Sequence, residues 1–199
     1  RSIWVTGVQT CALPISSAMI GVFNSIDHRI PKNAGSMRCI DVQIRRGSIA
    51  GGTLHPYSCS VATTNVSDRI ANAVQKAFAE LGDGLGMAEI GSALPPSHGV
   101  ISGTDARNGE AFINQIFLGS SGGGASPGSD GWLLYPHAGN GGMGYIDSVE
   151  LTEQYHPIRI AARHFIPDTE GAGRTRGAPS KYVEYGPVGG LYGDRKSVV

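Results

Sequence analysis

The segment from Pro167 to Gly177 carries the residues whose types and spacing are best suited to binding chemistry. Two glycines and two arginines stand close together in it: Gly171, Gly173, Arg174 and Arg176. Glycine frees the backbone, and arginines two residues apart point the same way in an extended chain. Such a loop can hold a carboxylate or a phosphate by bidentate hydrogen bonds. The alternative is a tight turn in which Asp168 accepts backbone N–H bonds, and the residues alone leave these two interpretations equal.

A run of small residues from Ser120 to Ala125 contains consecutive glycines, among them Gly122 and Gly123. Such glycines let a backbone approach a ligand or turn sharply. The run lacks the lysine of a phosphate-binding loop. A substrate loop and a structural crossing beside Asp130 therefore both stay open.

Two glutamates, Glu150 and Glu153, would share one face of a helix because they are three residues apart. They could support acid–base chemistry, but the pattern favours a solvated helix surface. The stretch from Gly139 to Gly144 matches the Gly-x-Gly-x-x-Gly pattern of dinucleotide sites. That pattern needs a preceding strand and a following helix, and Pro157 cuts short the helix that would follow it.

Composition excludes several classes of protein. The chain has 199 residues, with 16 Lys and Arg against 16 Asp and Glu, so no basic excess favours nucleic-acid binding. A hydrophobic share of 40% excludes a disordered chain, and no apolar run reaches the ~18 residues of a membrane span. Six histidines and three cysteines show no metal-ligand spacing, so we expect no metal site in this chain. The absence of a cysteine framework favours a reducing cytoplasm.

Hydrophobic periodicity predicts an α+β fold with a β-rich core, one clear amphipathic helix and long glycine-rich loops. The helix covers residues 67–81, with Ser67 as its cap and Gly82 as its stop. Its predicted apolar face is Ile70, Val74, Ala77, Phe78 and Leu81. An extended stretch is expected over 54–64.

Four segments show strand patterns: residues 38–49, 110–118, 157–167 and 181–185. In the first, apolar and polar residues alternate, as in a half-buried strand. In the second, apolar residues stand at both odd and even positions, which predicts burial on both faces. In the third, one face is predicted to carry Ile158, Ile160, Ala162, His164 and Ile166.

The two ends differ in character from the interior. Residues 5–16 read Val-Thr-Gly-Val-Gln-Thr-Cys-Ala-Leu-Pro-Ile-Ser, which resembles the translation of a sequencing adapter, and the tail resembles a similar read-through. We therefore expect segments 1–16 and 193–199 to be non-native. Residues 17–192 are then expected to be a partial domain from inside a longer protein.

The interior motifs resemble the hydantoinase B/oxoprolinase family over residues 17 to about 186. The most specific are Val149-Glu-Leu-Thr-Glu-Gln-Tyr-His-Pro157 and the segment from Pro167 to Gly177. The others are Asn33-Ala-Gly35 with the segment 37–44, Gly103-Thr-Asp105, and Gly122-Gly-Gly-Ala125 with Asp130-Gly131. The chain departs from the family patterns where Asp147-Ser148 replaces Thr-Pro, Thr169-Glu170 replaces Ser-Gly, and Ala178 replaces a glycine.

The resemblance implies a subunit fragment for ATP-dependent hydrolysis of cyclic amides such as hydantoins or 5-oxoproline. It implies a hydantoinase A-type partner that uses the ATP, and a divalent metal held by an upstream part of the subunit. We therefore expect no activity from the fragment alone. The within-family alternative is the large subunit of an acetone-type carboxylase, and the alternative from another class is a non-catalytic β-rich scaffold.

The same resemblance nominates site residues. Glu150 and Asp168 are candidate catalytic residues. The candidate substrate-binding residues are Gly122, Gly123, Gly171, Gly173, Arg174 and Arg176.

Overall fold

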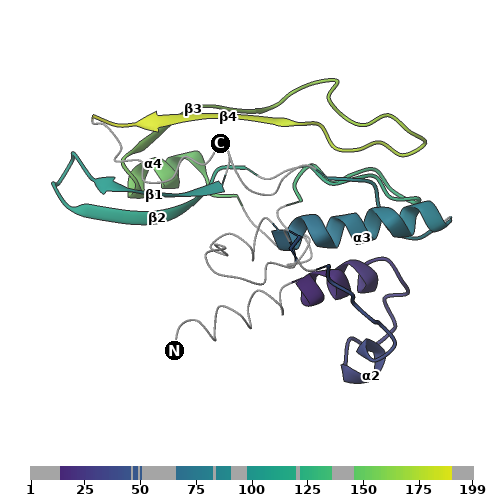
Figure 1. Cartoon of the computed structure of the whole chain (residues 1–199). Coiled ribbons are helices and arrows are strands. Elements are labelled where there is room, and N and C mark those ends of the chain that lie inside the picture. The colour runs from purple at the N-terminus through teal and green to yellow at the C-terminus, as the bar shows by residue number, and fades with distance from the viewer. Residues whose placement is uncertain are drawn as a thin grey trace, which may run out of the picture.

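The computed structural model describes residues 14–45, 47–48, 50, 66–82, 84–90, 98–119, 122–135 and 146–189. Within these ranges it contains helices and two separate antiparallel hairpins (Figure 1), which confirms the predicted α+β class. The extended stretch at 54–64, the glycine motif at 139–144 and almost all of both predicted foreign ends lie outside the described residues. The expectations for them stay predictions.

The predicted amphipathic helix is α3 (Ser67–Leu81), and it ends at Gly82, whose φ is 152°. It packs against a helix formed by residues 14–23. At Gly21 an added Cβ would lie 2.6 Å from the Cβ of Val74, so the two helices need glycine at this crossing. Ser67 is not the cap: Val66 holds that position, and the Ser67 hydroxyl accepts a hydrogen bond from Ser17 Oγ at 2.7 Å.

The buried face of α3 differs from the predicted one. Leu81 is 73% exposed, whereas the buried residues of the helix are Ser67, Asp68, Ala71, Asn72 and Gln75. The reason is the segment 84–90, whose backbone runs beside the helix. Ile90 N donates to Asn72 Oδ1 at 3.1 Å, and Arg69 Nη1 donates to Ile90 O at 2.9 Å. Asn72 therefore faces inward because its side chain satisfies this neighbouring backbone.

The prediction of a strand over 38–49 is wrong. The short helix α2 (Ala34–Met37) precedes it, begun by a capping box in which Asn33 and Ser36 bind each other's backbone N–H groups. The half-buried positions Ile40, Val42 and Ile44 still alternate with exposed ones. No described segment pairs with this stretch, so the alternation does not produce a sheet.

The first hairpin joins β1 (His98–Thr104) to β2 (Ala111–Phe117), with His98 opposite Phe117. The sequence predicted β2 but not β1. Burial of β2 on both faces is wrong, because Ile113 is 76% exposed.

The second hairpin joins β3 (Ile158–Phe165) to β4 (Lys181–Pro187). The sequence predicted both strands but not their pairing. A bulge interrupts β3: Ile160 pairs with Tyr185, but Ala162 already pairs with Glu184. One extra residue reverses the side-chain alternation beyond it.

This reversal corrects the predicted face of β3. Ile158 and Ile160 face the core, but His164 pairs with Tyr182 on the opposite face, and their rings stack 5.1 Å apart. Arg163 and Phe165, instead of His164, lie on the inner face. Arg163 is opposite Val183, and Phe165 is opposite Lys181.

A small core joins the two hairpins to α4 (Val149–Tyr155). Leu118 and Ile158 are fully buried in it, and Ile160 is nearly so. The partly buried residues around these are Ile101, Val149, Val183 and Tyr185. Figure 1 shows α4 between the hairpins, with α3 beside them.

Candidate substrate-binding site

Three loop segments meet beside α3, and we call them the glycine-loop cluster. They are residues 122–126, 129–132 and 175–178. Backbone hydrogen bonds tie them together: Gly123 N donates to Trp132 O at 2.7 Å, and Ala178 N donates to Gly123 O at 3.1 Å. The structure therefore brings the predicted glycine run and the predicted arginine loop to one place.

Close backbone contact explains the glycines of the first two segments. An added Cβ at Gly131 would lie 2.1 Å from Gly123 O, and one at Gly124 would lie 2.2 Å from Ala88 O. At Gly122 it would lie 2.6 Å from the Cβ of Ala178. These distances leave no room for a side chain, so close chain crossing accounts for the glycines at these positions.

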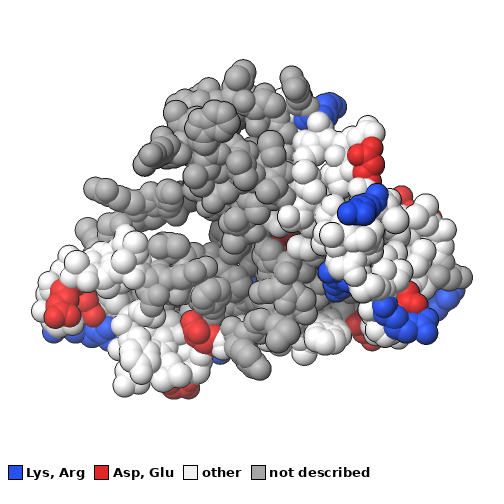
Figure 2. All heavy atoms as spheres, turned by 90° about the horizontal axis from the view of Figure 1, so that it is seen from below, with Lys and Arg blue, Asp and Glu red and all other residues white. Residues whose placement is uncertain are grey.

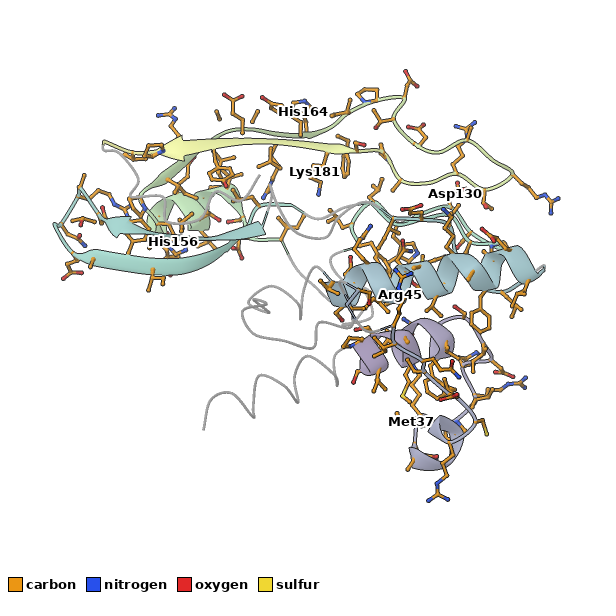
Figure 3. All side chains as sticks on the ribbon, in the orientation of Figure 1. Met37, Arg45, Asp130, His156, His164 and Lys181 are labelled. Atoms are coloured by element: carbon orange, nitrogen blue, oxygen red, sulfur yellow. The ribbon has the colours of Figure 1, made fainter. Side chains whose placement is uncertain are left out.

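The arginine loop is fixed through its backbone. Arg176 N donates to Asp130 Oδ1 at 2.7 Å, and Arg176 O accepts from Gly131 N at 2.7 Å. The side chains of Arg174 and Arg176 are exposed, and neither makes an ion pair or hydrogen bond within the described ranges. Asp130, labelled in Figure 3, therefore holds the backbone of this loop in place. The guanidinium groups of Arg174 and Arg176 make no polar contact with a described residue that would prevent them from binding a ligand.

Thr169, rather than Asp168, holds the turn that begins this loop. Thr169 Oγ1 donates to Ile166 O at 2.7 Å and accepts from Ser180 N at 2.7 Å. Asp168 has a φ of 58° and an exposed side chain, and its carboxylate accepts no hydrogen bond from a described residue. The expectation that this carboxylate orders the turn is therefore wrong. A hydroxyl does so at the position where the family pattern has serine.

Gly171 and Gly173 differ in their surroundings. An added Cβ at Gly171 would meet nothing within 4 Å, whereas one at Gly173 would lie 2.7 Å from Thr175 O. Only Gly173 is thus required by local packing, and Gly171 lies on an open side of the loop.

The two glutamates of α4 have separate roles. Glu150 is exposed in the first turn of the helix. Glu153 is half-buried, and its Oε1 accepts a hydrogen bond from Ile160 N at 2.8 Å, directly before the β3 bulge. The prediction that both glutamates lie on a solvated helix face is wrong, because the Glu153 side chain accepts a hydrogen bond from the backbone of β3. Neither forms a carboxylate pair with the other.

Two cations on the inner face of the β3–β4 hairpin were missed by the sequence analysis. Burial, and secondarily the charge of Arg163, lower the pKa of Lys181 from 10.5 to about 8. Arg163 Nη1 donates to Asp147 O at 2.7 Å. Figure 3 shows Lys181 and His164 on opposite faces of the hairpin. No alternation pattern could have found this pair, since the bulge that turns Arg163 inward leaves no periodic signal.

A second arginine network fastens the β1–β2 turn to α4. Arg107 forms a bidentate pair with the largely buried carboxylate of Asp105, and this pairing lowers the pKa of Asp105. Arg107 Nη1 also donates to Glu153 O and Gln154 O, each at 3.1 Å. The motif Gly103-Thr-Asp105 thus anchors the β1–β2 turn to the end of α4.

The described residues contain no group of three or more His, Cys, Asp or Glu able to hold a metal ion. The family resemblance places its divalent metal in an upstream part of the subunit, so none of these residues is proposed as a ligand. None of the described helices combines the length and the apolar character needed to cross a membrane. On the face shown in Figure 2, the acidic and basic side chains of the described residues are interspersed.

With this fold and loop cluster in place, comparison with known proteins defines the class. The chain matches hydantoinase B/oxoprolinase over residues 4–187, and it belongs to this family. It is similar to the crystal structure of the ATP-dependent caprolactamase from Pseudomonas jessenii, with a TM-score of 0.69 and 27% sequence identity. The alignment covers 87% of this chain but 30% of that chain, so the chain spans about a third of the length of this relative. No curated protein sequence matches it.

Proposed function

We propose that the chain is a segment of a B-type subunit in an ATP-dependent hydrolase of cyclic amides, with hydantoins or 5-oxoproline as substrates. The family match over residues 4–187 carries this proposal. The similar caprolactamase, which is ATP-dependent, supports the reaction class. The proposed partner is a hydantoinase A-type subunit that supplies the ATP chemistry, and the proposed compartment is the cytoplasm.

The glycine-loop cluster supplies the substrate contacts in this proposal. Opening an amide ring develops negative charge on the carbonyl oxygen and ends in a carboxylate product. The exposed guanidinium groups of Arg174 and Arg176 suit such an oxygen or a substrate carboxylate. Asp130 holds the backbone N–H of Arg176, so it fixes the direction in which that loop presents its arginines.

Of the two candidate catalytic residues, Asp168 fits a chemical role better. Its carboxylate is exposed and unpaired among the described residues, and it lies on the same loop as both arginines. Glu150 lies on α4, and nothing in the described chain ties it to the glycine-loop cluster. No step is assigned to a metal on this chain.

The test is an assay of the complete subunit with an A-type partner, using hydantoin, 5-oxoproline and caprolactam with and without ATP. We expect ATP-dependent appearance of the ring-opened amino acid from at least one substrate. The 199-residue chain alone should show none.

An Arg176→Lys variant keeps the charge but loses the planar fork. We expect kcat/KM to fall by roughly 10- to 150-fold, which corresponds to about 1.5–3 kcal/mol for a charge-assisted hydrogen bond. The free energy of unfolding should not change. Arg38→Lys, an exposed arginine distant in sequence from the cluster, is the matched control.

Two results would overturn the proposal. Incorporation of bicarbonate into a product, without ring opening, would assign the subunit to the carboxylases instead. A subunit that binds its partner but turns over no substrate would favour the scaffold alternative.

A further inference from the structure

Arg163 and Lys181 come together on the inner face of the β3–β4 hairpin. Phe165 pairs with Lys181, and Arg163 pairs with Val183, so all four side chains share one face. Both cations are half-buried, and Lys181 Nζ lies 5.1 Å from the centroid of the Phe165 ring. The pair is therefore built into the sheet and does not lie on a free surface.

The bulge in β3 is what creates this arrangement. If this same sequence paired regularly from Ile160 onward with no bulge, Arg163 would lie opposite Tyr182 and point to the outer face with the exposed Glu184. Glu153 supports the bulge by accepting the hydrogen bond of Ile160 N. The bulge, supported by the Glu153 carboxylate, thus places Arg163 on the same face as Lys181.

Neither cation has an acidic partner in the described part of the chain. None of the ion pairs formed there includes Arg163 or Lys181. Arg163 reaches a backbone carbonyl, that of Asp147, and the nearest carboxylate of the hairpin, Glu184, pairs with Tyr182 on the other face. Partial burial of two like charges costs free energy unless an anion compensates for it.

The pair also lies next to the glycine-loop cluster along the chain. The carbonyl oxygens of Ala178 and Pro179 would lie 3.2 Å from a Cβ at Gly122, and only Ser180 separates Pro179 from Lys181. The cations therefore adjoin the segment in which the candidate substrate contacts gather.

We propose that Arg163 and Lys181 form an oxyanion-binding site that takes a phosphate or a carboxylate group. The guanidinium offers a planar fork and the ammonium offers a point charge, and this combination suits either oxyanion. The proposal rests on the proposed function only for the source of the anion, which would be a phosphorylated substrate or a carboxylate product.

The test measures anion binding by the 199-residue chain, without a partner or turnover. Inorganic phosphate and sodium acetate are titrated separately at constant ionic strength. Isothermal titration calorimetry gives the affinity, and the Cε–Hε NMR signals of the lysines report where the anion binds. We expect a saturable shift of the Lys181 signal and no saturable shift of the Lys76 signal, since Lys76 is already paired with Glu89.

The variants Lys181→Gln and Arg163→Gln should each weaken the binding by about tenfold or more. Lys76→Gln, the matched control, should leave it unchanged, and Lys181→Arg should retain most of it. Binding of phosphate alone identifies a phosphoryl group as the ligand, tighter binding of acetate identifies a carboxylate, and equal binding shows a site that takes either oxyanion.

The inference is overturned if neither anion shifts the Lys181 signal saturably in the folded wild-type chain. It is also overturned if Lys76→Gln weakens binding as much as Lys181→Gln does. The NMR measurement on the wild-type chain decides the matter even if a glutamine variant does not fold. Because no turnover is measured, a failure here leaves the ring-opening assay unaffected, and the converse also holds.

Discussion

The glycine-loop cluster and the β3–β4 hairpin are neighbours along the chain, but they use their residues in opposite ways. In the cluster, Gly131 and Gly124 are required because backbones meet there at distances that admit no side chain. In the hairpin, Arg163 and Lys181 are half-buried, and no described carboxylate accounts for them. The glycine pattern thus marks a place where backbones cross, whereas the half-buried cations mark a candidate anion site.

The largest effect is expected where the cluster depends on glycine. Gly131→Ala places a Cβ 2.1 Å from Gly123 O, so backbone must move. We expect a loss of about 2–3 kcal/mol in the free energy of unfolding, as overpacking against a fixed backbone produces. Chemical denaturation measures this loss.

Gly171→Ala is the matched control, because nothing lies within 4 Å of the added Cβ. It should change the free energy of unfolding by less than about 0.5 kcal/mol. Equal losses for both variants would show that the cluster is not held by close backbone contact.

The next effect concerns the support of the bulge. Glu153→Ala removes the acceptor of Ile160 N and should cost about 1–2 kcal/mol in the free energy of unfolding. Glu150→Ala, on the exposed side of the same helix, should cost less than about 0.5 kcal/mol. If the two variants were equally stable, Glu153 would not be what holds the bulge.

The titration of Lys181 tests the hairpin directly. NMR should show Lys181 titrating at about pH 8, whereas hydrogen bonding to Glu89 raises the pKa of Lys76 above 10.5. Between about pH 8 and 10.5 the unfolded chain then binds more protons at Lys181 than the folded chain does. This contribution makes the free energy of unfolding rise with pH in that window.

Lys181→Met should remove that rise, and Lys76→Met should not. A Lys181 that titrates near 10.5 would contradict the uncompensated burial on which the comparison depends.

The smallest effect is expected for the exposed arginines of the cluster. Arg174→Ala and Arg176→Ala should each change the free energy of unfolding by less than about 0.5 kcal/mol, because neither side chain has a partner among the described residues. Thermal or chemical denaturation checks this. A loss of about 1 kcal/mol or more would show that these guanidinium groups serve the fold and are not free for substrate.

The elements that depend on local periodicity can be predicted from the amino-acid sequence. It predicted α3 and its end at Gly82, the strands β2, β3 and β4, the α+β class, and the family. It also placed Gly122 and Arg176 in motifs of one family, and the structure brings them together. The helix and the strands follow from the spacing of apolar residues within one segment, which has a period of 3.6 in a helix and 2 in a strand.

Only the tertiary structure decided which faces of these elements are used. Asn72 is buried because the backbone of residues 87–90 runs beside α3 and its Ile90 N–H needs an acceptor. Arg163 faces inward because one bulged residue reverses β3, and the extended stretch at 40–45 pairs with no described strand. Each outcome depends on chain that is distant in sequence, which a segment's own periodicity does not contain.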